Sequence, residues 1–360
     1  FFDQSFFKRK IVMWTEQYRP KRLDDIVGHD EVVKRLQGFV KEKTIPNLVL
    51  WGPKGTGKTS LVYALARELY GEFYDENIMH IETADFVAQG KKWLKENKRF
   101  KFFYNEQKSA LVIFKEMIRE YAALAPINAS FKLLFFSNAD LLPINAQQAL
   151  RRIMERSNKT CRFILSTTKP AGIIPALRSR CLNLHFGSLD KSGAMELLIR
   201  SIADEEGVNI TDRGLKTLKN YARGDAGAAI TILEAAASAA SSTPTIDEQK
   251  IEDVAHNAFF QRQKAEELID LTFRGRHKDL RARLEFLMRE ERIGGKELLV
   301  EIHEALRRKM QMTKDESSLF ARLVVYEGDA DLNLCTSFNS MIHVEEMFTK
   351  MSQAVGHRFL

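Results

Sequence analysis

The sequence predicts an α/β fold, a mainly parallel sheet with helices on both faces, followed by two regions that are entirely helical. Three observations predict it. A phosphate-binding motif comes directly after a short apolar run, and strand-like and helix-like segments alternate around that motif. From about residue 188 onward the strand pattern stops, and apolar residues recur with helical spacing.

The phosphate-binding motif is the G-x-x-x-x-G-K-T segment Gly52–Thr59, which follows the expected strand Leu48–Trp51. Its glycines let backbone N–H groups turn toward a polyphosphate, Lys58 supplies a cation for the β- and γ-phosphates, and Thr59 offers its hydroxyl to Mg²⁺. A helix expected over Ser60–Glu68 adds the positive end of its dipole. We therefore predict a site for ATP or ADP with Mg²⁺ and not a glycine turn that matches by chance. The predicted binding residues are Gly52, Pro53, Lys54, Gly55, Thr56, Gly57, Lys58, Thr59 and Ser60.

An arm precedes this strand. The segment Trp14–Asp30 is expected to be extended and to end in a turn at Gly28, because Pro20 fixes the backbone and stops a helix. The arm lies just upstream of the motif strand, where a nucleotide base would need a wall. Arg19, Pro20 and Val27 are therefore predicted to contact the nucleotide.

The other elements are assigned from apolar spacing. Further strands are expected over Ile78–Ile81, Phe131–Phe136 and Arg162–Ser166. Helices are expected over Glu31–Lys43, Leu111–Ala123, Ala146–Glu155, Leu189–Glu206, Thr211–Ala222 and Gly227–Ala239. The predicted domains are a disordered extension at 1–12, the sheet domain at 13–187, a small helical domain at 188–240, a linker at 241–245 and a last helical domain at 246–360.

The segment 86–108 mixes basic and aromatic residues as an insertion in the sheet domain. Interleaved charge and aromatic rings can bind single-stranded nucleic acid. The alternative, which we favour, is a surface helix and loop whose aromatic side chains pack onto the body of the domain. The aromatic residues concerned are Trp93, Phe100, Phe102, Phe103 and Tyr104.

Composition excludes several classes of protein. No apolar run approaches the roughly 20 residues that span a bilayer, so no membrane association is expected. Three cysteines, far apart in the chain, indicate neither a disulfide framework nor a zinc site and are typical of a reducing interior. The 55 lysine and arginine residues against 48 aspartate and glutamate residues give a net charge of +7, which is compatible with a polyanionic partner.

Four landmarks now stand in a characteristic order. They are W-x-x-x-Y-R-P from Trp14, the phosphate motif, A-L-R-R-x-M-E at Ala149–Glu155, and S-R-C at Ser179–Cys181. In this order they resemble the small subunits of replication factor C, the sliding-clamp loader of archaea and eukaryotes. The resemblance covers Trp14 to about Ala240 and implies an AAA+ ATPase domain, a helical lid and an all-α collar.

The resemblance also implies partners. Five subunits assemble through their collars into a hetero-pentameric ring, which uses ATP to open a sliding clamp and close it around primer–template DNA. Such a loader contacts the DNA backbone without reading bases. The chain is then expected inside the cell, in the cytoplasm of an archaeon or in the nucleus of a eukaryote.

Three arginines take their roles from the same resemblance. Arg180 of S-R-C would be an arginine finger that acts in the ATP site of the adjacent subunit, whereas Arg178 would not. A surface salt bridge is the alternative for Arg180. Arg151 and Arg152 match a pair of arginines that would contact DNA or a neighbouring subunit, and the residues do not separate these two roles.

Four positions depart from the pattern of an active member. Ser137 stands where an aspartate would hold Mg²⁺, and Asn138 stands where a glutamate would activate water. Thr168 replaces the usual sensor asparagine, and Gly227 replaces the arginine of the lid. Loss of a general base costs about 10²–10⁴ in rate. We therefore expect a chain that binds nucleotide, hydrolyses it poorly and supplies Arg180 to its neighbour.

Asp140, the next carboxylate after Asn138, lies past the end of the expected strand and is not expected to reach the nucleotide. Two alternatives stay open. An independently active AAA+ ATPase of the helicase or remodeller type is disfavoured by Ser137 and Asn138. A purely structural ring subunit without nucleotide is disfavoured by the intact Gly57-Lys58-Thr59.

Overall fold

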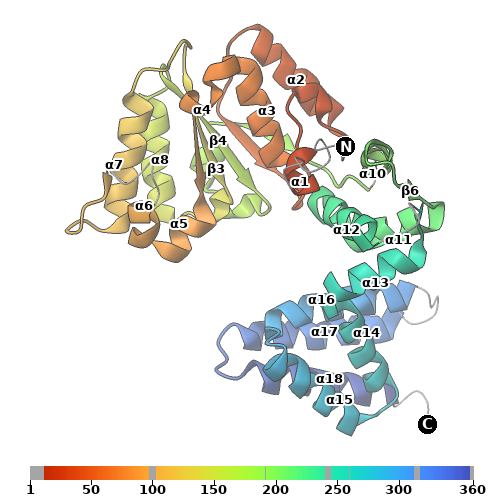
Figure 1. The fold of residues 1–360 in the computed structure, drawn as a ribbon. Helices are drawn as coiled ribbons and strands as arrows, with labels where there is room; N and C mark the ends of the chain where they lie inside the picture. Colours follow the sequence, from red (N-terminus) through yellow and green to blue (C-terminus); the bar gives the residue numbers. More distant parts are fainter. Residues whose placement is uncertain are drawn as a thin grey trace, which may run out of the picture. The chain divides into compact units, whose positions relative to one another are not determined.

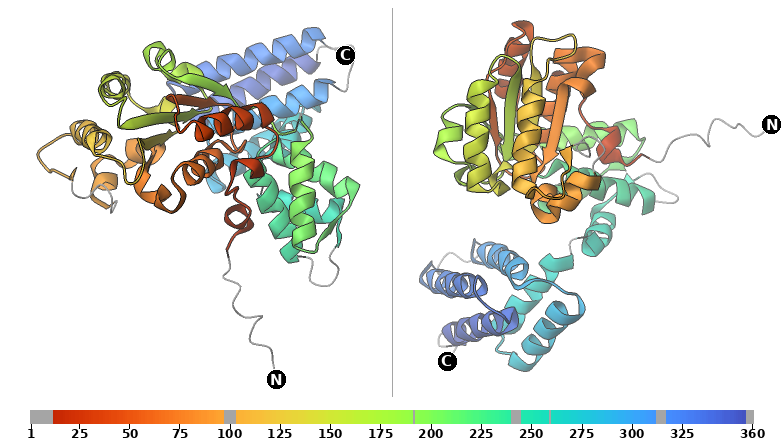
Figure 2. Two further views of the ribbon diagram at one scale, coloured as in Figure 1. Left: turned by 90° about the horizontal axis from the view of Figure 1, so that it is seen from above. Right: turned by 90° about the vertical axis from the view of Figure 1, so that its left-hand side faces the viewer.

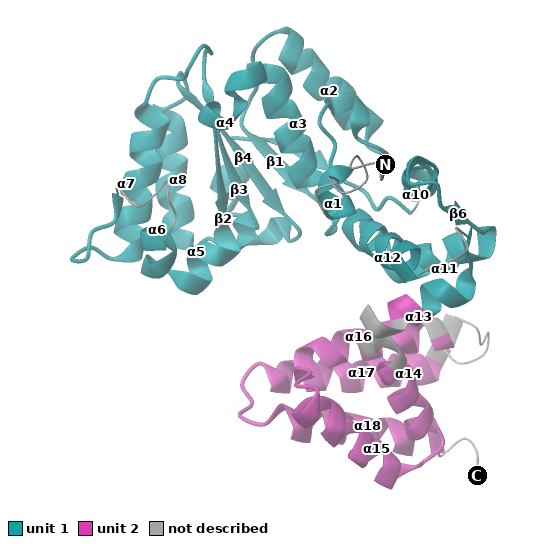
Figure 3. Cartoon of the chain, viewed as in Figure 1, with its two compact units in different colours: residues 1–252 teal, residues 253–360 magenta. Residues whose placement is uncertain are grey.

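The structure is a computed structural model that describes residues 12–96, 103–190, 192–239, 245–258, 260–311 and 317–356. Two compact units divide the chain, Phe1–Glu252 and Asp253–Leu360 (Figure 3). The extension expected at 1–12 lies outside the described residues except for Val12, which is exposed.

The first unit contains a five-stranded parallel sheet in the order β2-β3-β4-β1-β5 (Figure 1). Its strands are β1 (Leu48–Trp51), β2 (Ile78–Glu82), β3 (Lys132–Ser137), β4 (Cys161–Thr167) and β5 (Leu182–His185). Four of them confirm predicted strands. The edge strand β5 was not predicted, because only Leu184 of its four residues is buried and no apolar run marks it.

Helices cover both faces of this sheet, as predicted (Figures 1 and 2). One face packs against α2 (Asp30–Lys41) and α3 (Lys58–Tyr70), and the other against α7 (Ala110–Ala123) and α8 (Ile144–Arg156). Side chains alternate between the faces of a strand. In β3, Leu133 and Phe135 therefore enter the core beside α3, whereas Leu134 and Phe136 enter the core beside α7 and α8.

The arm differs from its prediction at its start. Trp14–Gln17 form one helical turn, α1, and Leu23–Asp25 form a 3₁₀ turn, η2. The Trp14 backbone N–H donates to Glu234 at 3.1 Å, and the Tyr18 hydroxyl donates to Glu206 at 2.6 Å. These long-range contacts hold the arm against the helices that follow the sheet, and local spacing does not reveal them.

Three helices follow the sheet, as predicted, although the first begins later. They are α10 (Ala194–Glu205), α11 (Asp212–Ala222) and α12 (Ala226–Ala239). The two-residue strands β6 (Asn209–Ile210) and β7 (Thr245–Ile246) pair in parallel. Of the linker predicted at 241–245, Thr245 thus belongs to a strand, and the other four residues lie outside the described part. The pairing attaches Thr245 and Ile246 to the rest of the first unit.

The segment 86–108 follows the packing alternative where it is described. It contains parts of α5 (Thr83–Gln89) and α6 (Lys91–Glu96). The Phe86 ring stacks on Phe114 with 4.3 Å between centroids, and the buried Trp93 ring meets Phe86 edge-on at 5.8 Å. Phe103 and Tyr104 pack on the same core. Phe100 and Phe102 lie outside the described residues.

Short helical turns complete the described part of the first unit. They are η3 (Gly71–Phe73), α4 (Tyr74–Asn77), η5 (Ala139–Leu141), η6 (Pro170–Gly172) and α9 (Pro175–Arg178). Helix α13 (Glu248–Ala258) spans the division between the two units.

The second unit is helical, as predicted, around a core that includes Leu268, Leu306 and Phe348. Its helices are α14 (Phe260–Phe273), α15 (His277–Glu285), the π-helical turn η7 (Phe286–Glu290), α16 (Gly295–Gln311), α17 (Ser317–Leu334) and α18 (Ser340–Gly356). Among the described residues, no helix combines the length and apolar character that crossing a membrane requires.

Candidate nucleotide-binding site

A cavity of about 600 Å³ lies in the first unit. It is formed by the phosphate loop (Gly52–Thr59), the arm, the ends of three strands, and helices α10 and α12. Helices α10, α11 and α12 are called the lid below. The cavity brings together most of the predicted site residues. These are Arg19, Pro20, Val27, Lys54, Gly55, Thr56, Gly57, Lys58, Thr59, Ser60, Ser137, Asn138, Thr168 and Gly227. Gly52 and Pro53 are not among the described residues that line it, but their carbonyls contact Lys58.

The glycines of the loop are required by its conformation and its neighbours. Gly55 has φ +70°, and a Cβ on it would lie 2.0 Å from Oδ1 of Asp225. The Gly55 carbonyl also accepts from the Ala226 N–H at 3.0 Å, at the start of α12. Gly57 has φ +87° and immediately precedes α3. The lid thus touches the phosphate loop, and Asp225 is a contact that the motif did not predict.

Lys58 is folded onto its own loop. Its ammonium donates to the Gly52 carbonyl at 2.9 Å, to the Pro53 carbonyl and to the Thr56 hydroxyl at 3.3 Å. Burial lowers the pKa of Lys58 to about 8, which Asp225 partly offsets. Removing an ammonium from water disfavours its charged form, and a polyphosphate would favour that form again.

His29 contacts the phosphate loop through a hydrogen bond. Its ring is buried, its Nε2–H donates to the Thr56 carbonyl at 2.9 Å, and its centroid lies 4.6 Å from that of Phe186. Burial lowers the pKa of His29 from its ordinary value of 6.5, so the neutral ring is the folded form. The arm prediction placed this residue near a turn and did not identify its contact with the loop.

This pKa predicts a pH-dependent stability. Above pH 6.5 His29 is neutral in both states and contributes no pH dependence. Below pH 6.5 the unfolded ring protonates first, so the free energy of unfolding falls as pH falls, by at most about 1.4 kcal/mol per pH unit, until the folded ring protonates too. Urea unfolding of the wild type and His29→Gln between pH 7.5 and 5 checks this. A variant with the same pH dependence as wild type would contradict it.

An apolar part of the lining comes from the arm and the lid. Pro20, Ile26 and Val27 belong to the arm, and Leu198 and Ile230 belong to α10 and α12. The hydrogen bond from Tyr18 to Glu206 joins the arm to the residue that follows α10. Burial, together with the contact to Glu206, raises the pKa of Tyr18 to about 12. Apolar walls with a few polar groups are typical of ligand sites.

The departures at the end of β3 lie in the cavity beside a carboxylate that the motifs did not identify. Glu82, the last residue of β2, also lines the cavity. Ser137 Oγ donates to Glu82 Oε2 at 2.5 Å, and Asn138 Nδ2 donates to Glu82 Oε1 at 2.7 Å. Adjacent parallel strands end at one edge, so a polar residue that ends β2 was a usable signal.

Asp140 takes no part in this group. Its Oδ1 accepts from the Thr167 hydroxyl at 2.5 Å, and it does not occur among the described lining residues. Asp140 thus lies outside the described lining of the cavity, and that it does not reach a bound nucleotide stays a prediction. Thr168 and Ser166 line the cavity at the end of β4, and Gly227 does so from the first turn of α12.

The predicted arginine finger lies elsewhere on the surface of the unit. Arg180 Nη2 is 2.6 Å from Glu155 Oε1, and its Nη1 donates to the Ala176 carbonyl at 2.8 Å. Arg180 is not found among the described residues lining the cavity of its own chain. Arg151 is half-buried and Arg152 is exposed, both on α8. These three arginines are separate from the nucleotide cavity.

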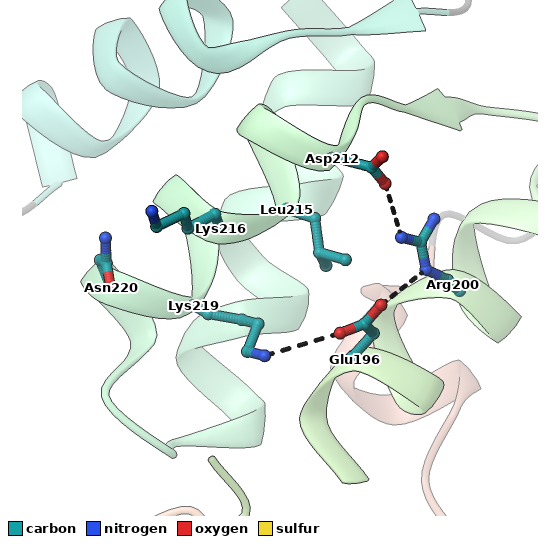
Figure 4. A pocket seen from close by; sticks show the side chains of 7 residues that line it. All are labelled: Glu196, Arg200, Asp212, Leu215, Lys216, Lys219 and Asn220. Atoms are coloured by element: carbon teal, nitrogen blue, oxygen red, sulfur yellow. Dashed lines mark hydrogen bonds and ion pairs between the residues drawn. The ribbon is translucent and has the colours of Figure 1, made fainter. Parts of the chain in front are cut away.

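A second hollow, of about 400 Å³, lies between α10 and α11 (Figure 4). Four of its five charged side chains pair with one another, and Lys216 is the fifth. Glu196 contacts Lys219 at 3.7 Å and Arg200 at 3.2 Å, and Arg200 contacts Asp212 at 2.8 Å. Exposed ion pairs of this kind contribute little and give no sign of a ligand. We therefore interpret the hollow as a surface groove between α10 and α11 and not as a ligand site.

The chain is similar to known families, to curated relatives and to a solved structure. The family model described as "ATPase family associated with various cellular activities (AAA)" matches residues 48–187, and a model of a protein of unknown function (DUF815) matches residues 5–88. The replication factor C small subunit of Archaeoglobus fulgidus is 33% identical over 341 residues, which are 94% of this chain and 97% of the relative. The replication factor C small subunit of Methanocella arvoryzae is 32% identical over 342 residues, covering 93% and 94%.

Among solved structures, the chain is similar to the RuvB Holliday junction branch migration motor of Thermotoga maritima. It is 17% identical, has a TM-score of 0.47, and the match covers 79% of this chain and 85% of that one.

Proposed function

The chain belongs to the family of replication factor C small subunits, and from that premise we propose that it is a clamp-loader subunit that holds ATP, hydrolyses it poorly and completes its neighbour's site. The observation that carries the nucleotide part is the cavity, in which the phosphate loop meets the arm and the lid. Ser137, Asn138, Thr168 and Gly227 line the same cavity. The departures thus concern the groups that would surround one nucleotide.

The residues present fit a magnesium nucleotide in part. Lys58 and the backbone of the phosphate loop suit the phosphates, and Thr59 and Glu82 offer oxygen ligands in the cavity. Bound Mg²⁺ would neutralise charge on the phosphate oxygens. Asn138 cannot accept a proton at neutral pH, and Ser137 brings no negative charge. The chain therefore binds and orients the nucleotide but lacks a base at the end of β3.

The proposed action on a neighbour rests on Arg180. Its guanidinium is partly exposed and is held by Glu155, an exposed pair of the kind that contributes little to stability. Such a guanidinium can leave its carboxylate partner for a phosphate of the nucleotide bound in an adjacent subunit at a small cost in free energy. A finger stabilises the charge that develops on the transferring phosphoryl group. This makes the chain part of an ATP-hydrolysing complex even though its own site is impaired.

The remaining parts of the proposal follow from the family. The hetero-pentamer, the sliding clamp and primer–template DNA are the proposed partners, with Arg151 and Arg152 as contacts to DNA backbone or to a neighbouring subunit. Contacts to phosphates would make DNA binding fall steeply with salt. The place of action would be the cytoplasm of an archaeon or the nucleus of a eukaryote.

Co-expression with the other loader subunits tests the proposal. We expect this chain to purify in the complex with bound ATP or ADP and clamp loading to require it. The purified chain should turn over ATP about 10²–10⁴ times more slowly than an active site with its base intact. Turnover by the isolated chain at the rate of an active member would favour an independent ATPase. A complex in which this chain retains no nucleotide would favour a structural subunit.

A further inference from the structure

We infer that Glu82 is the metal-directed carboxylate of this nucleotide site, supplied by β2 in place of the acidic residues that are missing from β3. The inference rests on the proposed function and deepens it. Glu82 lines the cavity together with Lys58 and Thr59, the residues predicted to hold the phosphates and Mg²⁺. The negative charge of Glu82 thus lies in the same cavity as the residues predicted to hold the phosphates and Mg²⁺.

The sheet places Glu82 beside the missing acids. Strands β2 and β3 are parallel neighbours, and Glu82 is in register with Ser137. Its two carboxylate oxygens are 2.5 Å from Ser137 Oγ and 2.7 Å from Asn138 Nδ2. The carboxylate therefore lies within one hydrogen bond of both positions from which the expected acids are absent. The negative charge at this edge of the sheet therefore comes from β2, next to the strand from which the expected acids are missing.

A chain of hydrogen bonds sets the orientation of Glu82. Ser137 Oγ–H donates to Glu82, so the same oxygen accepts from His80 Nε2–H at 2.7 Å. His80 Nδ1 then accepts from the Tyr63 hydroxyl at 3.0 Å. The His80 ring also stacks on Phe135, 4.5 Å between centroids, and this packing holds the chain in place.

This arrangement leaves Glu82 able to bind a metal. Each of the two hydrogen bonds uses one lone pair of a Glu82 carboxylate oxygen. Its oxygens each keep a further lone pair, which an oxygen-seeking cation such as Mg²⁺ takes, directly or through a bound water. Glu82 would therefore add affinity for the magnesium nucleotide, while Asn138 still occupies the position of the glutamate that would activate water. The poor hydrolysis and the retained nucleotide then have one structural basis.

The test is the gain in ATP affinity that Mg²⁺ produces, measured with a fluorescent ATP analogue in Mg²⁺ and in EDTA. In Glu82→Gln we expect this gain to fall about tenfold or more, the order of effect seen when a group that orients a metal is lost. The affinity in EDTA should not fall, because the variant removes a negative charge from the side of the phosphates. Asp140→Asn is the matched control, since it makes the same change at a carboxylate that Thr167 holds outside the cavity lining described above. This control should keep the full gain.

A second variant guards against a local folding defect in the first. Combining Glu82→Gln with Asn138→Asp returns a carboxylate to the same hydrogen-bonded pair and should recover most of the magnesium gain. The inference is overturned if Glu82→Gln keeps the full gain, or if it weakens binding equally with and without the metal. If the wild-type chain binds no ATP in either condition, the proposed nucleotide function fails and this inference fails with it.

Discussion

Lys58→Met weakens ATP binding by this chain at least about 30-fold, because it removes the buried cation of the phosphate loop while keeping its volume. Truncating one partner of a buried charge pair costs about 2–5 kcal/mol, and each 1.4 kcal/mol is tenfold in affinity. Lys54→Met removes a charge from the same loop, but its side chain is 91% exposed. Water screens an exposed charge, so we expect less than a tenfold loss there.

The pH dependence of binding provides a second signature of Lys58. Because burial lowers its pKa to about 8, the free chain loses this charge above that pH. Phosphates bind the protonated form, so wild-type ATP affinity should be flat below pH 8 and fall toward tenfold per pH unit above it. Lys58→Met should show no such fall. Titrations between pH 7 and 9.5 measure both, and equal affinity of the two lysine variants would contradict the role of Lys58.

Arg180→Ala in this subunit alone lowers the ATP turnover of the adjacent site by about 10³ or more, the effect measured where arginine fingers are removed. The measurement uses assembled loader in which the other ATP sites are inactivated at their phosphate-loop lysines. Arg180 does not belong to the described lining of its own cavity, so the ATP affinity of this chain should stay the same. Unchanged turnover would contradict the role in the neighbouring site.

Glu155→Gln distinguishes this role from a surface salt bridge. It removes the negative charge from the 2.6 Å contact to Arg180 but leaves the guanidinium in place. If Arg180 acts on the neighbour, Glu155→Gln retains most of the turnover while Arg180→Ala does not. If the pair is only structural, the two variants have equal and small effects on turnover and on stability.

Local signals predicted much of the sheet domain. The apolar runs of β1, β2, β3 and β4 are buried on both faces, which is why each run marks a strand. Strand β5 lacks that signal because it lies at an edge and has exposed residues. Helix α1 as a whole was missed for a related reason, since its four residues contain no buried side chain.

The candidate site likewise has a part that local sequence signals predict and a part that they do not. The phosphate loop could be found because its chemistry needs particular residues at fixed spacing within eight positions. The contacts of Asp225 with Gly55 and of His29 with Thr56 join segments that are distant in sequence. Neither leaves a local pattern. Such contacts depend on how the lid and the arm fold back on the sheet.

By itself the sequence determined the nucleotide loop, the family and the loss of acidic residues after β3, since each is recognised from short motifs of a few consecutive residues. Only the tertiary structure decided that this edge of the sheet still carries a negative charge. Parallel pairing of β2 with β3 brings Glu82 to Ser137, 55 residues further along the chain. A motif is read along one strand, whereas the charge of a site is the sum over all the strands that end there.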